Sequence, residues 1–89
     1  MEFEWDPAKA EANLAKHGID FRDAALLLRG PVLDRPSSYA AEPRRVAIGR
    51  LPDEREAAVI YTIREGRYRI ISARRARENE RRAYRQVHG

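Results

Sequence analysis

The chain has 89 residues, no cysteine, and 16 arginines among its 18 basic side chains, which give it a formal net charge of +4. The length allows one domain, residues 1–89, with one core, and the lack of cysteine excludes disulfides and thiolate metal sites. The longest apolar run, residues 57–63, is too short to span a membrane, and no leader sequence opens the chain, so we expect a cytoplasmic protein without a membrane partner.

The first third of the sequence predicts a short strand followed by two helices. Residues 2–5 alternate between polar and apolar side chains, which is typical of a half-buried strand. The Asp6-Pro7 pair supplies an N-cap and a proline at the first helical position. Gly18 suits the end of this helix, because glycine readily adopts the left-handed conformation. Asp20 predicts the cap of a second helix, which ends near Gly30-Pro31.

The middle of the sequence predicts an edge strand, a loop and two further strands. Residues 32–35 are a candidate edge strand, and the residues from Pro36 to Pro43 predict a loop. Residues 45–51 alternate in polarity, and residues 57–64 are rich in β-branched and aromatic side chains, so both runs predict strands. Glu65-Gly66 predicts a two-residue hairpin loop, since glycine accepts a positive φ.

The strand after this loop carries the residues on which the functional prediction depends. Residues 67–74 return antiparallel to the preceding strand, and a strand-to-helix junction is expected at Arg74-Arg75. Strict alternation places Arg69 and Arg75 on one face of this strand and Arg74 on the other.

A C-terminal helix is predicted for residues 76–87, because Ala76, Ala83, Tyr84 and Val87 follow one another at helical spacing. The element order is therefore β-α-α-β-β-β-β-α. It predicts an α+β fold in which two N-terminal helices and a C-terminal helix pack on a small antiparallel sheet.

Arginine is concentrated in the C-terminal part of the chain. Eight of the 16 arginines lie between Arg67 and Arg85, and residues 44–89 carry a net charge of +7, whereas residues 1–43 carry −3. A guanidinium group is a planar donor that matches phosphate oxygens in pairs. The distribution indicates a polyanionic ligand, an acidic protein partner or both; the alternative is a solvated basic face.

Three motifs follow one another along the chain: FEWDPAK at residues 3–9, NLAKHG at residues 13–18, and RIISARRA at residues 69–76. Together they resemble the BrnT family of bacterial type II toxins. The resemblance implies a fold similar to RelE-type ribonuclease toxins and a substrate that is RNA. It also implies a cognate BrnA-like antitoxin with a ribbon-helix-helix domain, which neutralises the toxin in a hetero-oligomer and reaches promoter DNA through that complex.

The resemblance also assigns catalytic residues. The family's basic residues that are tied to toxicity correspond by position to Arg64, in the sequence Tyr-Thr-x-Arg, and to Arg74 and Arg75, in the sequence Ser-Ala-Arg-Arg-Ala. The sequence adds His17 as a candidate for proton transfer, because histidine can exchange a proton near neutral pH. The alternative role of His17 is to stabilise the C-terminal end of its helix.

Four further basic residues are expected to hold RNA phosphates: Lys16, Arg45, Arg67 and Arg69. Metal-independent cleavage uses the 2′-hydroxyl of RNA as the nucleophile. Arginine can stabilise the charge that develops on the phosphate, but it cannot move protons because it stays protonated. No cofactor is expected, and two distant histidines without any cysteine argue against a metal site.

Some side chains have a second possible role. Glu78 and Glu80 are candidate bases, although Glu78 is spaced to form a helical ion pair with Arg82. Phe3 and Trp5 are candidates for stacking on RNA bases, but their alternation with acidic residues favours a place in the core.

Three functions remain open from the sequence. The first is a ribonuclease toxin that a partner neutralises. The second is a non-catalytic basic subunit that binds RNA or antitoxin and acts in promoter repression as part of the complex. The third is an interaction subunit whose basic face receives an acidic antitoxin. The residues alone favour the second function, because no acid–base pair is evident, whereas the family resemblance favours the first.

Overall fold

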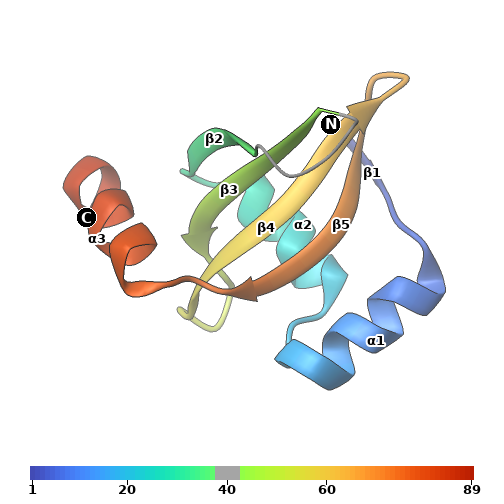
Figure 1. Ribbon diagram of the computed structural model, residues 1–89, viewed down its shortest axis with the longest axis horizontal. Coiled ribbons are helices and arrows are strands. Elements are labelled where there is room, and N and C mark those ends of the chain that lie inside the picture. Colours follow the sequence, from blue (N-terminus) through green and yellow to red (C-terminus); the bar gives the residue numbers. More distant parts are fainter. Residues whose placement is uncertain (38–42) are drawn as a thin grey trace.

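In the computed structural model, which describes residues 1–37 and 43–89, one β-sheet carries two helices on one face and a third helix on the other (Figure 1). The elements are β1 (Glu2–Glu4), α1 (Pro7–His17), α2 (Phe21–Arg29), β2 (Leu33–Ser37), β3 (Arg44–Arg50), β4 (Glu56–Arg64), β5 (Arg67–Arg75) and α3 (Glu78–His88). This order confirms the predicted arrangement and the α+β class. No helix in the described ranges is long and apolar enough to cross a membrane.

The five strands lie in the order β1-β5-β4-β3-β2, so the first and last strands of the chain are neighbours. β2 to β5 pair antiparallel, whereas β1 pairs parallel with β5. The sheet is therefore mixed at one edge, where the sequence predicted antiparallel pairing throughout. A three-residue strand carries no signal for its direction. The position of β1 is fixed by packing, since the Phe3 and Tyr68 rings meet edge to face with centroids 5.7 Å apart.

The helix ends and the β4–β5 turn follow the local sequence signals. The Asp6 carboxylate accepts a hydrogen bond from the backbone N–H of Ala8, and the Asp20 carboxylate caps α2 in the same way. Gly18 ends α1 with a φ of 68°. Glu65 and Gly66 have φ values of 53° and 78°, as a two-residue hairpin turn of the favoured twist requires.

The edge strand β2 extends further than predicted. Pro36 and Ser37 belong to this strand and not to the loop that the sequence suggested. Proline is tolerated there because an edge strand needs no ladder hydrogen bond on its outer side. The rest of the predicted loop, residues 38–42, lies outside the described residues.

The predicted apolar stripe of the C-terminal helix is wrong at Val87, whereas Ala76 and Tyr84 are buried as predicted. Val87 is 62% exposed, and the buried side chains of the helix are Glu80 and Tyr84. These two residues are one turn apart, so they share a helix face. The helix turns this face to the sheet because Glu80 pairs with an arginine of β5. A charged core-facing residue is invisible to a search for apolar periodicity.

Two separate cores form, one on each face of the sheet. The larger core lies between the sheet and the α1–α2 pair, and its fully buried side chains include Ile19, Phe21, Val59 and Ile70. The smaller core lies under α3 and consists of Ile48, Ala58, Ala76 and Tyr84. Ala57 and Ala58 are adjacent in β4 and belong to different cores, as strand alternation requires.

The Asn13 side chain joins α1 to the sheet. Its Nδ2 donates to the carbonyl oxygens of Ile19 and Ala73, at 3.1 and 3.0 Å, and its Oδ1 accepts from the backbone N–H of Ala73 at 3.0 Å. The pairing of β1 with β5 ends at Arg69, so no strand reaches Ala73 on this side. The Asn13 carboxamide supplies the two hydrogen bonds that a neighbouring strand would have made.

We expect Asn13→Ala to destabilise the fold by about 2–4 kcal/mol, because it leaves buried backbone donors and acceptors unpaired. Urea unfolding monitored by circular dichroism measures this loss. Asn79→Ala is the matched control, since Asn79 is exposed on α3. A loss for Asn13→Ala no greater than that for Asn79→Ala would contradict the role given to the carboxamide.

Candidate functional site

Four of the predicted arginines lie on one face of the sheet. The register of the β4–β5 pair places Arg67 opposite Arg64, Arg69 opposite Thr62, and Arg74 opposite Ala58. Directly opposed residues share a face, and every second residue of β4 returns to it. We call the four residues Arg64, Arg67, Arg69 and Arg74 the arginine face. It is the face on which α3 packs, because Ala58 belongs to the core under that helix.

A β-bulge creates this grouping. Ile60 pairs with Ser72 while Tyr61 pairs with Ile70, so Ile71 is an extra residue in β5. The extra residue reverses the alternation beyond it. Arg69 and Arg74 therefore share a face, although strict alternation predicted that they would not.

The pairing with β1 neutralises half of the arginine face. Parallel register sets Glu2 beside Arg67 and Glu4 beside Arg69. The Arg67–Glu2 ion pair spans 3.2 Å and is largely exposed, whereas the Arg69–Glu4 pair spans 2.7 Å with both side chains about 30% exposed. Exposed ion pairs contribute about 0–1 kcal/mol. The Arg67 guanidinium can therefore exchange its carboxylate for another anion at little cost.

Arg74 is held more firmly, at the junction between β5 and α3. Its Nη1 and Nη2 donate to the two carboxylate oxygens of Glu80, at 2.7 and 2.9 Å. The Glu80 Oε1 also accepts from the backbone N–H of Arg77, at 2.7 Å, and so caps the start of α3. These hydrogen bonds lower the pKa of Glu80 and raise the pKa of Arg74, so both groups stay charged.

Arg75 lies on the opposite face of the sheet. It pairs with Ala57, which belongs to the core under α1 and α2, and its side chain is exposed. Within the described residues its guanidinium takes part in no ion pair. The prediction that Arg74 and Arg75 point to opposite sides is confirmed.

Three other predicted site residues also lie away from the arginine face. His17 is half-buried and Lys16 exposed in the last turn of α1, whose C-terminal end Arg55 fixes through a hydrogen bond of 3.1 Å to the Gly18 carbonyl. His17 lies one turn after Asn13 and so shares its sheet-facing side. Arg45 is ion-paired with Asp34, at 3.1 Å, on the α1–α2 face of the sheet.

The partners of the arginines are the residues that sequence reasoning missed. Glu80 was considered as a base, but a carboxylate that accepts three hydrogen bonds and has a lowered pKa binds protons weakly. From the sequence, Glu2 and Glu4 are the polar residues of a half-buried strand and an improbable metal-binding face, and nothing in the pattern predicts that they pair with arginines. The sequence holds no clear signal for Glu80, because the capping-box pattern requires Ser, Thr, Asp or Asn at the N-cap, where this helix has Arg77. Among the described residues, no group of three or more His, Asp or Glu side chains is arranged to hold a metal ion.

Replacing Glu80 with glutamine tests how far this pair stabilises the junction. We expect Glu80→Gln to lower the free energy of unfolding by about 1–3 kcal/mol, because a hydrogen bond to a charged group is lost and Arg74 keeps its charge without a counterion. Chemical denaturation measures the change. Glu78→Gln is the control, since Glu78 is 79% exposed in its ion pair with Arg82. Equal stability of the two variants would contradict this assignment.

The same pair predicts a pH dependence. The pKa of Glu80 is lowered from its ordinary value of 4.5, so its stabilisation is complete above that value and is lost as the pH falls through the folded-state pKa. The stability difference between wild type and Glu80→Gln should therefore be constant near neutral pH and shrink below pH 4.5. Unfolding curves for both proteins at a series of pH values measure this difference. A difference that grows on acidification would contradict the lowered pKa.

Comparison with known proteins agrees with this architecture. A family model described as the ribonuclease toxin BrnT of type II toxin–antitoxin systems matches residues 5–80. The chain is also similar to the Brucella abortus ribonuclease toxin BrnT, known from a 1.1 Å crystal structure. The TM-score is 0.64 and the identity 31%, over 88% of this chain and 99% of the Brucella chain. The comparison with curated proteins gave no match. The chain therefore belongs to the BrnT family of ribonuclease toxins of type II toxin–antitoxin systems.

Proposed function

We propose that the chain is an endoribonuclease toxin that cuts RNA without a metal ion and that a cognate BrnA-like, ribbon-helix-helix antitoxin neutralises it. Family membership supports a ribonuclease toxin. The observation that carries the proposal is the arginine face, which presents guanidinium groups in a row along β5 up to the β5–α3 junction.

The RNA backbone lies along β4 and β5 in this proposal. Arg67 and Arg69 are two residues apart, or about 7 Å along a strand. Arg64 stands directly opposite Arg67 at the hairpin end. Phosphate oxygens replace Glu2 as the partner of Arg67, because the existing ion pair is exposed and weak.

Arg74 stabilises the reacting phosphate. A guanidinium has five N–H donors. Arg74 uses three for the two Glu80 oxygens and the Arg75 carbonyl. The remaining donors can bind a phosphate oxygen while Glu80 keeps the side chain in one orientation. Donors that are already oriented toward developing charge are worth about 10²–10³-fold in rate.

The cleavage step uses groups of the substrate. The 2′-oxygen attacks phosphorus as its proton passes to a base, the bond to the 5′-oxygen breaks, and that oxygen takes up a proton. Arginine cannot carry either proton. His17, the candidate for proton transfer, and Arg75 lie on the α1–α2 face of the sheet, opposite Arg74. We therefore propose them as a separate candidate site, not as partners of Arg74 on one phosphate.

Substitutions at Arg74 test the catalytic role of the arginine face. We expect Arg74→Ala/Glu80→Gln, which removes both charges of the pair, to lower kcat by about 100-fold or more. Arg82→Ala should leave kcat unchanged, since Arg82 is an exposed helical residue. Cleavage of a defined RNA by antitoxin-free protein in EDTA measures both rates, with folding checked by circular dichroism. A 2′-deoxy substitution at the cut site should abolish cleavage.

Separate Arg75→Ala and His17→Gln variants test whether either residue on the α1 side of the sheet contributes to cleavage. A fall in kcat with either variant supports the separate candidate site on that side. If the wild type binds RNA with a salt slope of about 0.7 per phosphate contact but cuts nothing, the protein is a binding subunit and the enzymatic proposal fails. The three carboxylates that already pair with Arg67, Arg69 and Arg74 make this second function a specific alternative.

A further inference from the structure

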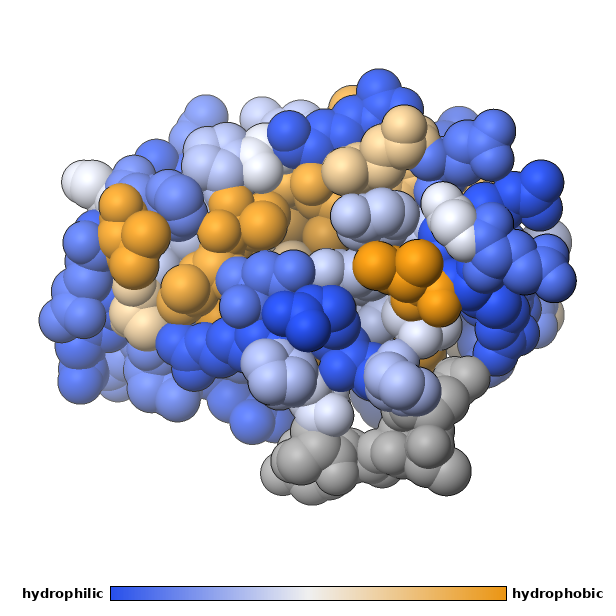
Figure 2. Space-filling model, turned by 90° about the horizontal axis from the view of Figure 1, so that it is seen from above, coloured by the Kyte–Doolittle hydropathy of each residue, from blue (hydrophilic) through white to orange (hydrophobic). Residues whose placement is uncertain are grey.

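Some of the exposed hydrophobic side chains of this protein lie close together. Figure 2 shows hydrophobic surface gathered in a band within largely hydrophilic surroundings. In the described ranges, the large hydrophobic side chains that are exposed are Met1, Leu14, Leu26, Ile63 and Val87. Met1 and Leu26 line one groove, and Leu14 lines a second hollow that shares Trp5 and Arg22 with the groove. Three of the five therefore border this pair of adjoining hollows, which we call the furrow.

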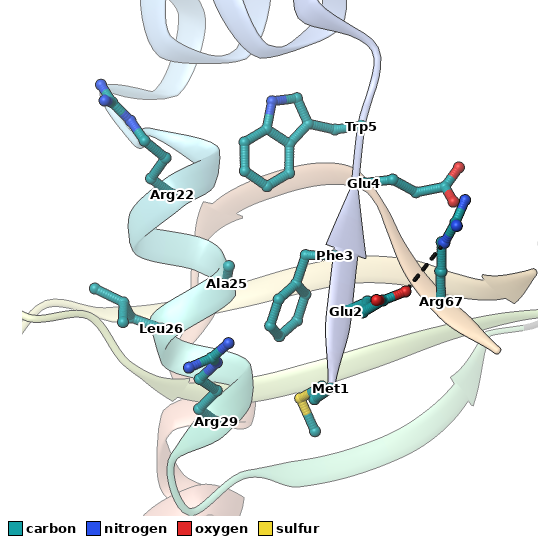
Figure 3. Close-up of a pocket in the computed structure, with 10 residues that line it drawn as sticks. All are labelled: Met1, Glu2, Phe3, Glu4, Trp5, Arg22, Ala25, Leu26, Arg29 and Arg67. Carbon is teal, nitrogen blue, oxygen red and sulfur yellow. Dashed lines mark hydrogen bonds and ion pairs between the residues drawn. The ribbon is translucent and has the colours of Figure 1, made fainter.

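The groove lies between β1 and α2 and has a volume of about 700 Å³ (Figure 3). Phe3 and Trp5 point from β1 toward α2, whereas Glu2 and Glu4 point away from it. Phe3 packs edge to face on Tyr68, and Trp5 does the same on Phe21 with centroids 6.1 Å apart. The apolar floor is therefore anchored in the main core, and a ligand would not have to order it.

The α2 wall is apolar at its centre and positive at its ends. Arg22, Leu26 and Arg29 follow the spacing i, i+4 and i+7, so they form one stripe along the helix. Leu26 is 53% exposed. The Arg22 side chain is 80% exposed and forms an ion pair with Asp20 at 3.0 Å, an exposed pair that another carboxylate can join. The Arg29 guanidinium lies 5.5 Å from the centre of the Phe3 ring. The β1 wall adds no free negative charge, because Glu2 and Glu4 pair with arginines of β5.

These features fit a protein segment better than RNA. An aliphatic leucine offers no surface on which a base stacks. The Arg29 guanidinium lies over the Phe3 ring, so this ring is not free to stack on a base. An amphipathic protein segment with an aliphatic side chain between two carboxylates matches the arginine–leucine–arginine stripe in both charge and polarity.

We propose that this furrow is the docking site for an amphipathic segment of the cognate antitoxin. The aliphatic side chains of the segment contact Leu26, Phe3 and Trp5, and its carboxylates bind Arg22 and Arg29. The inference rests on the proposed function, in which an antitoxin exists. It places the antitoxin along β1 and α2, where Arg67 at the rim of the groove is the one residue that the groove shares with the arginine face.

The experiment measures antitoxin affinity and RNA cleavage on the same variants. Leu26→Lys and Arg29→Glu alter the furrow without touching the arginine face, and Val87→Lys is the control, since Val87 is 62% exposed on α3. We expect each furrow variant to weaken binding of the purified cognate antitoxin by about 30-fold or more in calorimetry. Cleavage by the antitoxin-free variants should stay within twofold of wild type, and Val87→Lys should bind as wild type does.

A charge reversal sharpens the test. A glutamate-to-lysine change in the antitoxin segment should restore binding to Arg29→Glu and to no other variant. Unchanged affinity of both furrow variants would overturn the proposal, as would an equal loss with Val87→Lys or a loss of RNA binding with antitoxin affinity intact. A wild-type protein that cuts no RNA would defeat the ribonuclease proposal alone, because the affinity measurements would still decide the docking site.

Discussion

The double hydrogen bond between the Asn13 carboxamide and the backbone of Ala73 is the constraint on which the rest of the structure depends. These two bonds satisfy the backbone of β5 where β1 is too short to pair with it. A third hydrogen bond, from Asn13 to the Ile19 carbonyl, fixes the turn between α1 and α2. One side chain thus sets the position of both N-terminal helices against the last strand. A purely apolar contact between α1 and β5 would allow the helix to slide, whereas this geometry admits one register.

A few carboxylates compensate the positive charges of the arginine face. The arginine face sets like charges side by side, including Arg64 directly opposite Arg67. Such neighbours destabilise a sheet unless counterions accompany them. Carboxylates come from both ends of the chain: β1 supplies Glu2 and Glu4, and α3 supplies Glu80. The fold can therefore carry a dense basic surface in the absence of nucleic acid, and each carboxylate defines how readily its arginine is released to another anion.

The order of the elements could be predicted from the sequence because caps, glycines and polarity alternation are local signals. The Asp6 and Asp20 caps, the Gly18 terminus and the Glu65-Gly66 turn are all as the sequence indicates. The composition of the site depends on features that no local pattern encodes. The bulge at Ile71 decides which arginines share a face, and no local sequence signal marks it. The buried face of α3 contains a glutamate, so apolar periodicity selected Val87 in its place.

The joining of β1 to β5 has a consequence for how the protein is made. The Glu2–Arg67 and Glu4–Arg69 contacts link residues 65 positions apart, and Asn13 and Ala73 are separated by 60. Contacts of such long range form late in folding, after the intervening chain is available. A nascent chain emerging from the ribosome lacks β5 until residues 67–75 have left the exit tunnel. Until then, α1 has no strand to hold and the arginines have no common surface.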